Sequence, residues 1–366
     1  MSKVKFVLMF VLVIMIVGVF TILSGCKETA EPVAEEAAPA EEAAPAEEAA
    51  PAEEVKTSNP LVSGVSSEDE YIFVLCISNI EYFNAHKYEW TKLGEMFGVK
   101  TTIMGPAEFD LPATVATMDQ AIAKNPKGIC LFGVDPSLDP SIDKAIDAGI
   151  PVVVIIGDQP GSKRIAYIGS YGQDLGYLGG TKLAEALGGS GKVAVLTIPG
   201  YDQWDIREEG YRKAFDEYPG ISVVAVGDTG ADTIKAIQTA KDILVRFPDL
   251  SGFVGCDSTA AIGGIMAVEE MDMVGKVKII GMDRNSDILE KIKEGVLTGT
   301  VAQNDVSMMY WSMLTLISRN TYRPSLASDN EAANAVVEPD LIYLPPNYID
   351  KSNVDYYLEA NEMYAK

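Results

Sequence analysis

The chain has 366 residues, a formal net charge of −24 and one histidine. Its length exceeds what one ordinary hydrophobic core organises, so we expect two lobes of roughly 100 to 150 residues each. The acidic balance excludes a nucleic-acid-binding protein, because such a protein needs a basic face to neutralise phosphates.

The first 25 residues have the composition of an export signal. Two lysines lie within 1–5, residues 6–25 carry no charge, and small residues precede Cys26. A run of this length can also cross a bilayer as a retained helix. Residues 23–26, Leu-Ser-Gly-Cys, resemble the lipobox of bacterial lipoproteins. That resemblance implies a signal peptide over 1–25 and lipid modification of Cys26.

Residues 26–69 are predicted to be the lipidated cysteine and a disordered tether rich in Ala, Glu and Pro. The hexad EEAAPA repeats three times over 35–52. Its prolines interrupt any helix, its glutamates repel one another, and it offers no apolar face to bury. At about 3.1 Å per residue in an extended chain, roughly 30 residues reach on the order of 90 Å. The tether is therefore long enough to hold a domain well clear of a membrane.

Beyond residue 70, short runs of Val, Ile and Leu alternate with amphipathic stretches. Predicted strands begin at residues 71, 100, 128, 151, 165, 192, 222, 252, 276, 299 and 341. Predicted helices include 83–97, 175–187, 206–218, 233–247 and 306–319. Continuous apolar strands that alternate with helices indicate parallel sheets covered on both faces. The predicted fold class is α/β, with two doubly wound parallel-sheet lobes.

Polar side chains follow six of these strands. They are Ser78 with Asn79, Asp135, Asp158, Asp257, Asp283 and the run 303–305. In open parallel sheets, ligands bind in the crevice outside the carboxyl ends of the strands. Each residue taken singly is also a good N-cap for the helix that follows. Doublets such as 78–79 exceed what capping requires, so the set as a whole predicts a polar pocket.

Another polar segment follows the predicted strand that begins at residue 192. This segment, Pro-Gly-Tyr-Asp-Gln-Trp-Asp at 199–205, is predicted to be a long loop. It carries Trp204 ahead of Arg207, and an exposed indole there has no evident structural use. Carboxylates and amides hydrogen-bond to hydroxyl groups, and aromatic rings pack against C–H faces. This inventory suits a neutral polyhydroxylated ligand such as a sugar, and suits an anion such as phosphate badly.

The order of motifs from residue 70 to 344 resembles that of ribose-type periplasmic binding proteins, the type I solute-binding components of ABC sugar importers. The motifs are ISNIEYF, IPVVVIIGDQP, AYIGSYGQDLGYLGG, IREEGYRKAF, FVGCDSTAAIGGIMA, KIIGMDRNSDILEKIKEG and GTVAQND. The resemblance implies two Rossmann-like lobes joined by a three-crossing hinge, with a ligand in the cleft between them and closure on binding. The implied N-terminal lobe is 70–171 with 304–333, and the C-terminal lobe and tail are 172–303 with 334–366.

By motif position, the resemblance implies ligand contacts from successive strand exits. The expected ligand-binding residues, with Trp204 added from the loop above, are Ser78, Asn79, Tyr82, Phe83, Asp158, Trp204, Arg207, Asp257, Asp283 and Gln303. The chain departs from the family at the first crossing, where Ser170-Tyr171-Gly172 replaces Thr/Ser-Asp-Asn. It also departs at Asp257, where Asn is usual, and at Met282, where an aromatic ring is usual. Trp204 or Tyr82 can replace that ring.

Calcium and nucleotide sites are disfavoured. The run from Asp283 to Glu294 matches part of an EF-hand loop, but Ile288 stands where the sharp turn needs glycine. The segment GGSGKV at 188 lacks the spacing of a P-loop. We therefore expect no metal and no cofactor.

The histidine and the cysteines give no sign of catalysis. His86 is expected to be a surface or packing residue, which leaves a histidine triad or metal centre without its main component. Cys76, Cys130 and Cys256 lie in or at the end of apolar runs and are expected to be small buried thiols.

The sequence therefore predicts a monomeric, lipid-anchored receptor on the extracytoplasmic face of the cell membrane. It would capture a monosaccharide or related polyol and present it to an ABC permease.

A sensory protein for a furanosyl signal molecule or polyol would use the same closure to address a membrane receptor. A glycosidase would need a carboxylate pair such as Asp158 and Asp283. A cytoplasmic sugar-responsive repressor shares the fold, but an export signal stands where its DNA-binding headpiece would be.

Overall fold

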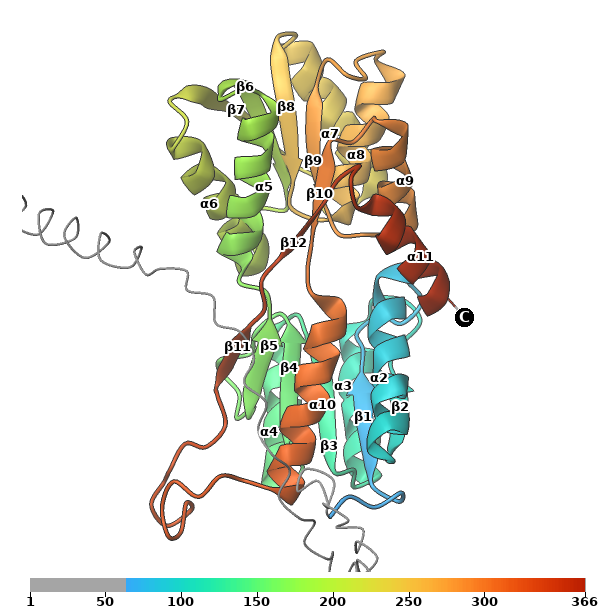
Figure 1. The fold of residues 1–366 in the computed structure, drawn as a ribbon, viewed down its shortest axis with the longest axis vertical. Helices are drawn as coiled ribbons and strands as arrows, with labels where there is room; N and C mark the ends of the chain where they lie inside the picture. The colour runs from blue at the N-terminus through green and yellow to red at the C-terminus, as the bar shows by residue number, and fades with distance from the viewer. Residues whose placement is uncertain (1–63, 366) are drawn as a thin grey trace, which may run out of the picture. The chain divides into compact units, whose positions relative to one another are not determined.

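The computed structural model describes residues 64–365, which contain two six-stranded sheets. The predicted signal peptide, Cys26 and the tether as far as residue 63 lie outside the described residues. Both sheets are built from the alternating strand and helix segments that the sequence predicts. The fold class is α/β with two doubly wound lobes (Figure 1).

The first sheet has the strand order β11-β5-β4-β3-β1-β2, and its pairs are parallel. Its strands are β1 (Glu70–Val74), β2 (Lys100–Met104), β3 (Gly128–Gly133), β4 (Val152–Ile156), β5 (Ala166–Gly169) and β11 (Leu341–Tyr343). The helices of this lobe are η1 (Glu81–Phe83), α2 (Asn84–Phe97), α3 (Leu111–Ala123), η2 (Pro136–Leu138), α4 (Asp139–Asp147) and α10 (Asp305–Thr321).

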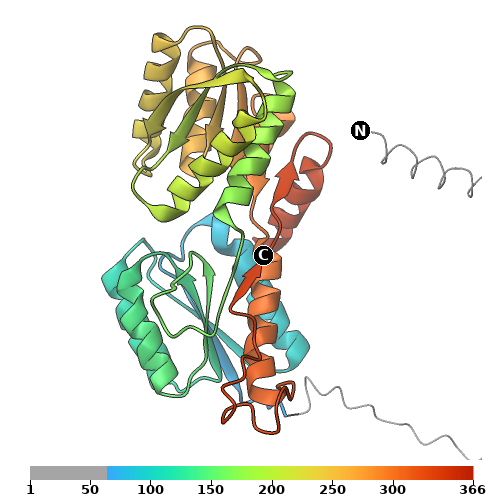
Figure 2. The ribbon, with the colours of Figure 1, turned by 90° about the vertical axis from the view of Figure 1, so that its left-hand side faces the viewer.

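Both faces of the first sheet are covered by helices, because alternate residues of each strand point to opposite sides. Phe73 and Cys130 pack with Trp90 of α2 and Met313 of α10, whereas neighbouring strand residues such as Ile72 pack with α3 and α4. The sheet thus forms the middle layer of three, with α2 and α10 on one side and α3 and α4 on the other (Figure 2).

The second sheet has the order β12-β10-β9-β8-β6-β7, in which only β12 is antiparallel to its neighbour. Its strands are β6 (Ser190–Thr197), β7 (Gly220–Asp228), β8 (Leu250–Gly255), β9 (Lys278–Met282), β10 (Gly299–Ala302) and β12 (Asn347–Ile349). Its helices are α5 (Gly172–Ala186), α6 (Asp202–Asp216), α7 (Thr233–Arg246), α8 (Ser258–Glu270), α9 (Ser286–Glu294) and α11 (Val354–Tyr364).

Three crossings join the lobes, at 170–171, 303–304 and 344–346, between the last residue of one sheet and the first element of the other lobe. Within each sheet the strand order reverses once, between β1 and β3 in the first and between β6 and β8 in the second. Such switch points are where open α/β sheets bind ligands. The polar residues that follow the predicted strands therefore lie at the carboxyl ends of the strands in each sheet, which is where a ligand is expected to bind.

Each strand predicted from the sequence is present, but three details differ. The segment 199–205 is not a loop throughout, because α6 begins at Asp202. The short strand β12 and the terminal helix α11 were not predicted. The sequence places 334–366 with the second lobe, whereas β11 pairs in parallel with β5 of the first sheet. The third crossing accordingly follows Tyr343 and not residue 333.

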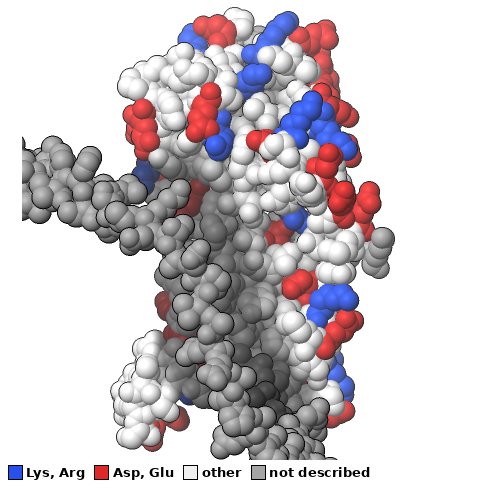
Figure 3. All heavy atoms as spheres, in the orientation of Figure 1, with Lys and Arg blue, Asp and Glu red and all other residues white. Residues whose placement is uncertain are grey.

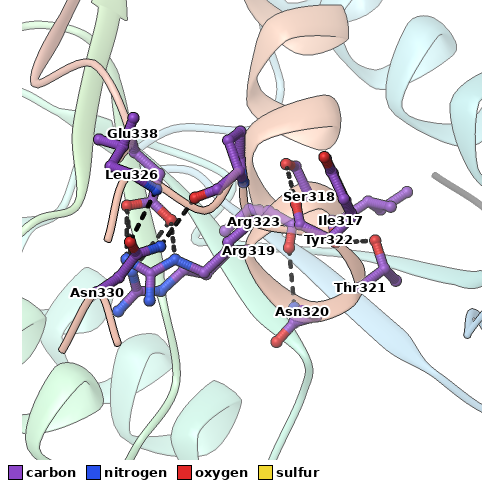
Figure 4. Close-up of polar contacts among 12 residues, drawn as sticks. Ile317, Ser318, Arg319, Asn320, Thr321, Tyr322, Arg323, Leu326, Asn330 and Glu338 are labelled. Atoms are coloured by element: carbon purple, nitrogen blue, oxygen red, sulfur yellow. Dashed lines mark hydrogen bonds and ion pairs between the residues drawn. The ribbon is translucent and has the colours of Figure 1, made fainter. Parts of the chain in front are cut away.

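In the segment 322–340, between α10 and β11, the carboxylate of Glu338 binds two arginines, one of them on α10 (Figure 4). Glu338 accepts hydrogen bonds from Arg319 at 3.0 and 3.1 Å and from Arg323 at 2.8 and 3.2 Å. The two guanidinium groups hold the pKa of Glu338 below its usual value. This double pairing fixes the start of β11 relative to α10.

Charges of both signs are interspersed over the described residues of the face drawn in Figure 3. Most ion pairs are exposed, as are Lys163 with Asp147 and Lys192 with Asp249. Exposed pairs of this kind contribute little to stability.

Between residues 64 and 365, no helix combines the length and the apolar character that a membrane span requires.

Helices α5 and α6 touch backbone to backbone through two glycines. A Cβ atom built on Gly176 would lie 1.9 Å from the carbonyl oxygen of Arg207, and one on Gly210 would lie 2.2 Å from that of Gln173. This close approach is possible only without side chains. It sets the position of α6 and therefore of Arg207 at the end of the second sheet.

Gly176→Ala is predicted to destabilise the protein by at least about 2 kcal/mol, because backbone atoms cannot yield to the new methyl group. Gly264→Ala in α8 is the matched control. Its Cβ would find its nearest neighbour at 3.5 Å, so this change leaves stability unaltered or raises it by up to about 1 kcal/mol. The midpoints of thermal unfolding test this, and equal midpoints for the two variants would contradict the packing described.

Candidate functional site

The first-lobe part of the candidate site follows β1. Ser78 and Asn79 are held by backbone hydrogen bonds to Pro106 and Ala107, at 2.8 and 3.1 Å. The side chain of Asn79 is exposed, whereas that of Ser78 is half-buried. Tyr82, on the short helix η1, is half-buried, and its ring lies 5.0 Å from that of Phe83.

Phe83 belongs to the core and not to an open surface. Its side chain is 1% exposed and its ring lies 5.0 Å from that of Phe132. His86 is likewise buried among Phe73, Tyr82 and Phe83, and burial lowers its pKa to about 3. The expected packing role of His86 is confirmed, and its imidazole is neutral at physiological pH.

Asp158 follows β4 and is held by Arg164. The guanidinium donates from Nε to Oδ1 at 2.5 Å and from Nη2 to Oδ2 at 2.9 Å. The backbone N–H of Gln159 also donates to Oδ1, at 2.7 Å. Asp158 caps no helix, so its carboxylate has a role other than N-capping.

The second-lobe part centres on Arg207, which α6 directs toward the end of β8. Its side chain is buried, and Nη1 donates to the carbonyl oxygen of Cys256 at 2.7 Å. Asp257, the next residue, is the N-cap of α8 and accepts from the backbone N–H of Ala260 at 2.7 Å. The capping role that a single strand-exit aspartate suggests is therefore present at Asp257.

Asp283 follows β9 in a backbone conformation that residues other than glycine seldom adopt. Its φ is 71°, and its N–H donates to Val301 at 2.8 Å while its carbonyl accepts from Thr300 Oγ1 at 2.7 Å. Non-glycine residues with positive φ occur most often where a site demands them. The side chain is 9% exposed and does not cap α9, the helix that follows it.

Arg207 and the two aspartates form one electrostatic cluster. Burial raises the pKa of Asp257, which Arg207 partly offsets. Burial also raises the pKa of Asp283 to about 6, Arg207 opposes that rise, and the neighbouring Asp257 adds to it. One buried guanidinium thus faces two carboxylates at the carboxyl ends of β8 and β9.

Tyr82 contacts a residue of the second crossing and interacts with the charges of this cluster. Gln303 Nε2 donates to the hydroxyl of Tyr82 at 3.0 Å. Burial holds the pKa of Tyr82 well above its usual value, and Asp305 and Asp283 add to that rise. The structure therefore brings Tyr82, Arg207, Asp257, Asp283 and Gln303 together, whereas Phe83 lies behind them in the core.

Trp204 lies in the first turn of α6 and not in an exposed loop. Its ring makes an edge contact with Tyr201 at 5.4 Å and packs on the core cluster that contains Tyr211. The indole therefore has a structural use that the sequence did not suggest. Its Nε1–H is nevertheless buried without a hydrogen-bond partner among residues 64–365.

Trp204 shares this feature with two other expected contacts. Arg207 Nε and Gln303 Oε1 are also buried and unpartnered within the described part of the chain. Buried polar groups are nearly always hydrogen-bonded, because an unpaired one costs about 1 to 3 kcal/mol. Two donors and one acceptor are thus left over at the edge where the sheets' strands end.

A second polar cluster joins the terminal helix α11 to both lobes. Glu81 accepts from the backbone and hydroxyl of Ser286, at 3.0 and 2.5 Å, and Asn361 donates to the carbonyl oxygen of Arg284 at 2.9 Å. A small cavity lies beside it, lined by Glu81, Tyr82, Asn84, Ala85, Arg284, Asn285, Asp305, Asn361 and Tyr364. The tail 345–366, for which the sequence suggested no role, therefore contributes to the surroundings of Tyr82.

Sequence reasoning missed Arg164, and it included Asp305 in the polar run 303–305 but not among the expected ligand-binding residues. Arg164 lies between two strands in a segment without a recognisable motif. Asp305 is 4% exposed, lies 3.4 Å from Arg284 Nε, and has its pKa raised to about 7 by burial. Its place directly after Gln303-Asn304 was the one available signal.

The residues of the candidate site can bind a ligand through hydrogen bonds and through contacts with aromatic rings. No group of three or more His, Cys, Asp and Glu side chains within residues 64–365 is placed to hold a metal ion. Cys76, Cys130 and Cys256 are free and buried, as expected, and burial raises the pKa of each thiol to about 12. Carboxylates, a guanidinium, an amide, a phenol and an indole remain to contact a ligand.

One protein family and several curated proteins are similar to this chain in sequence. The periplasmic binding protein domain family matches residues 71–319. The D-allose-binding periplasmic protein of Escherichia coli is 30% identical over 132 residues, which are 36% of this chain and 42% of that protein. Ribose import binding protein RbsB of Bacillus subtilis is 25% identical over 246 residues, 66% of this chain and 79% of RbsB. The aligned part thus spans less than half of the allose-binding protein.

Two solved structures share the fold over almost their whole length. AraP, an arabinose-binding protein of Geobacillus stearothermophilus, has a TM-score of 0.74 and 27% identity, covering 79% of this chain and 99% of AraP. A sugar-binding protein of a sugar ABC transporter from Bacillus halodurans has a TM-score of 0.75 and 28% identity, covering 79% and 100%.

The class is therefore that of the two-lobed periplasmic binding proteins. This chain belongs to the periplasmic binding protein domain family, and the resemblance to its ribose-type members is confirmed. Its relatives are binding proteins and not enzymes, and so is this chain. The glycosidase alternative is thereby excluded.

The raised pKa of Asp283 predicts a pH dependence of stability. An unfolded aspartate has a pKa of about 3.9, whereas Asp283 titrates at about 6 in the folded chain. Between these values the folded chain holds a proton that the unfolded chain has released. The free energy of unfolding therefore falls as the pH rises from about 4 to about 6, by on the order of 2 kcal/mol.

Asp283→Asn removes this contribution, so the variant is predicted to lose less stability than the parent over the same pH interval. Burial raises the pKa of Asp305 in both chains, and Asp283 adds to that rise in the parent alone, so the contribution of Asp305 changes the slopes in the same direction. Urea unfolding without ligand between pH 4 and 7 measures the two slopes. Identical slopes would show that folding does not raise the pKa of Asp283.

Proposed function

We propose that this protein is an extracytoplasmic solute-binding protein that captures a monosaccharide-like ligand between its lobes and delivers it to an ABC permease. The observation that carries the proposal is the cluster around Arg207. Three of the expected contacts there have a buried polar atom with no hydrogen-bond partner among residues 64–365, next to the carboxylates of Asp257 and Asp283. Relatives of the chain are described as binding allose, ribose and arabinose.

The residues around this cluster suit the hydroxyl groups of a sugar. Asp283 and Asp257 would accept hydrogen bonds from hydroxyls, and Arg207 Nε and Trp204 Nε1 would donate to hydroxyl oxygens. Asp158, Ser78 and Asn79 would complete the site from the first lobe. Tyr82 would provide a ring face and would exchange its bond with Gln303 for one to the ligand. Phe83 would support Tyr82 from the core.

Binding would favour the closed arrangement of the lobes. A ligand held by Asp158 on one lobe and Asp283 on the other makes its full set of contacts only when both lobes approach it. It therefore binds the closed state more tightly and shifts the population toward that state. No covalent step is needed. The closed lobes would be what the permease recognises.

A thermal-shift panel of pentoses, hexoses and polyols tests the proposal. A sugar at about 100 times its dissociation constant adds roughly 2.7 kcal/mol to stability and raises the unfolding temperature. Asp283→Ala is predicted to abolish the shift, because it removes a proposed ligand acceptor, and to remain folded, because Asp257 still faces the Arg207 guanidinium.

Asp216→Ala removes an exposed carboxylate at the end of α6 and serves as the matched control, with an unchanged ligand shift. No shift with any sugar or polyol would contradict the proposed ligand class. A shift that survives in Asp283→Ala would move the site away from the second-lobe cluster.

Transport and sensing share the same binding step. We propose transport, because the relatives include import binding proteins and a binding protein of a sugar ABC transporter. A sensory protein for a furanosyl signal molecule or a polyol would bind a polyol of that panel, or an autoinducer-like furanose added to it, and no aldose. Stimulation of a permease's ATPase by the ligand-loaded protein separates the two.

We also propose that Cys26 is lipid-modified after removal of residues 1–25 and that the following segment tethers the lobes to the outer face of the cell membrane. The support is the Leu-Ser-Gly-Cys sequence and its charge-free preceding run. One acyl chain anchors a protein only marginally, at about 0.8 kcal/mol per buried CH₂, so stable attachment needs the several chains of a diacylglyceryl cysteine.

Cys26→Ala is predicted to abolish membrane attachment in a bacterial host, and the parent chain is predicted to enter the detergent phase of a Triton X-114 partition. Cys76→Ala is the control, because its thiol is buried in the first lobe. Partition of the Cys26→Ala variant into the detergent phase at its mature mass would disprove the anchor.

A further inference from the structure

The ion pair between Arg164 and Asp158 links the proposed ligand site to the hinge. The Arg164 side chain is 5% exposed and that of Asp158 is 29% exposed. The guanidinium therefore stands behind the carboxylate, and Asp158 is the partner that a ligand can reach. Both carboxylate oxygens are bound, which leaves Asp158 little freedom to rotate.

The remaining donors of Arg164 are directed to Asp340. Nη1 donates to the carboxylate of Asp340 at 2.5 Å and to its carbonyl oxygen at 3.1 Å. The four hydrogen bonds use four of the five N–H donors of a guanidinium. Arg164 thus has almost nothing left to offer a ligand directly, so its effect on binding must pass through Asp158.

Asp340 directly precedes β11, and its carbonyl oxygen also accepts from the backbone N–H of Tyr167. Strand β11 leads into the third crossing at 344–346 and then into β12 of the second sheet. A side chain bound to both Asp158 and Asp340 therefore joins the ligand site of the first lobe to the strand that enters the hinge.

The backbone ahead of Asp158 is also constrained. Ile156, the last residue of β4, has a φ of 71°, which is a strained value for a β-branched residue. Its carbonyl oxygen accepts from the hydroxyl of Tyr167 at 2.9 Å. The turn that presents Asp158 is thus fixed from the backbone side, while Arg164 fixes it from the side-chain side.

We propose that Arg164 is a positioning residue of the ligand site, which orients the Asp158 carboxylate and ties it to the hinge strand through Asp340. This rests on the proposed function, in which Asp158 accepts a ligand hydroxyl. A lysine cannot replace Arg164, because a single ammonium group cannot make the two parallel bonds and reach Asp340 as well.

A double-mutant cycle tests the proposal with Arg164→Lys, Asp158→Asn and the double variant. Calorimetry would give the dissociation constant of each for whichever of D-ribose, D-allose and D-arabinose binds the parent most tightly. Arg164→Lys is predicted to weaken binding about tenfold in the parent, since one charge-assisted hydrogen bond is worth about that factor. It is predicted to weaken binding less than twofold in the Asp158→Asn background, where its partner is already altered.

Lys163→Met is the matched control, because Lys163 lies on the same segment and pairs with the exposed Asp147. It should leave the dissociation constant unchanged. Equal weakening by Arg164→Lys in both backgrounds, or failure of Arg164→Lys to fold while Asp158→Asn folds, makes Arg164 a structural residue and overturns the proposal.

The failure of the proposed function gives a different result. In that case either no sugar binds the parent, or Asp158→Asn binds the sugar as tightly as the parent does. Either result rejects the assignment of Asp158 to the ligand site, whatever the effect of Arg164→Lys. Weaker binding by Asp158→Asn with no effect of Arg164→Lys leaves the proposed function standing and contradicts the positioning role alone.

Discussion

One buried guanidinium, that of Arg207, organises the proposed site at the end of the second sheet. Arg207 is 7% exposed, shares its environment with Asp257 and Asp283, and keeps only part of its hydrogen-bonding capacity for the protein. Burying a charge is costly unless it is paired, and removing one partner of a buried pair is more costly still. The cluster therefore exists because its three members support one another, and it remains incompletely bonded where a ligand is proposed to sit.

The fold supplies the means to hold this cluster in place. Glycines bring α5 and α6 into backbone contact, which fixes Arg207, while β8 and β9 end side by side and present Asp257 and Asp283. The left-handed backbone at Asp283 is stabilised by two hydrogen bonds to the neighbouring strand β10, through Val301 and Thr300. Strain at a ligand site and unpaired buried atoms reduce stability, and well-packed sheets on both sides allow the protein to tolerate them.

Much of this was predictable from the sequence, and the exceptions have physical reasons. Apolar runs of five or six residues identify parallel strands, so β1 to β11 were found. The strand β12 has the sequence Asn-Tyr-Ile at a sheet edge and carries too little periodicity to be recognised. Strand-exit polar residues were identified by position alone, which cannot separate Phe83 in the core from Tyr82 beside the cluster. Arg164 was missed because an ion pair between two loop residues leaves no pattern in the sequence.

The most direct test of the central claim is isothermal titration of the purified chain with simple sugars at pH 7. The account predicts one molecule bound per chain, with a favourable enthalpy from hydrogen bonds to charged groups and loss of measurable heat when the sugar hydroxyls are methylated. Absence of binding heat for every pentose, hexose and polyol would contradict it, as would equal binding of a fully methylated sugar.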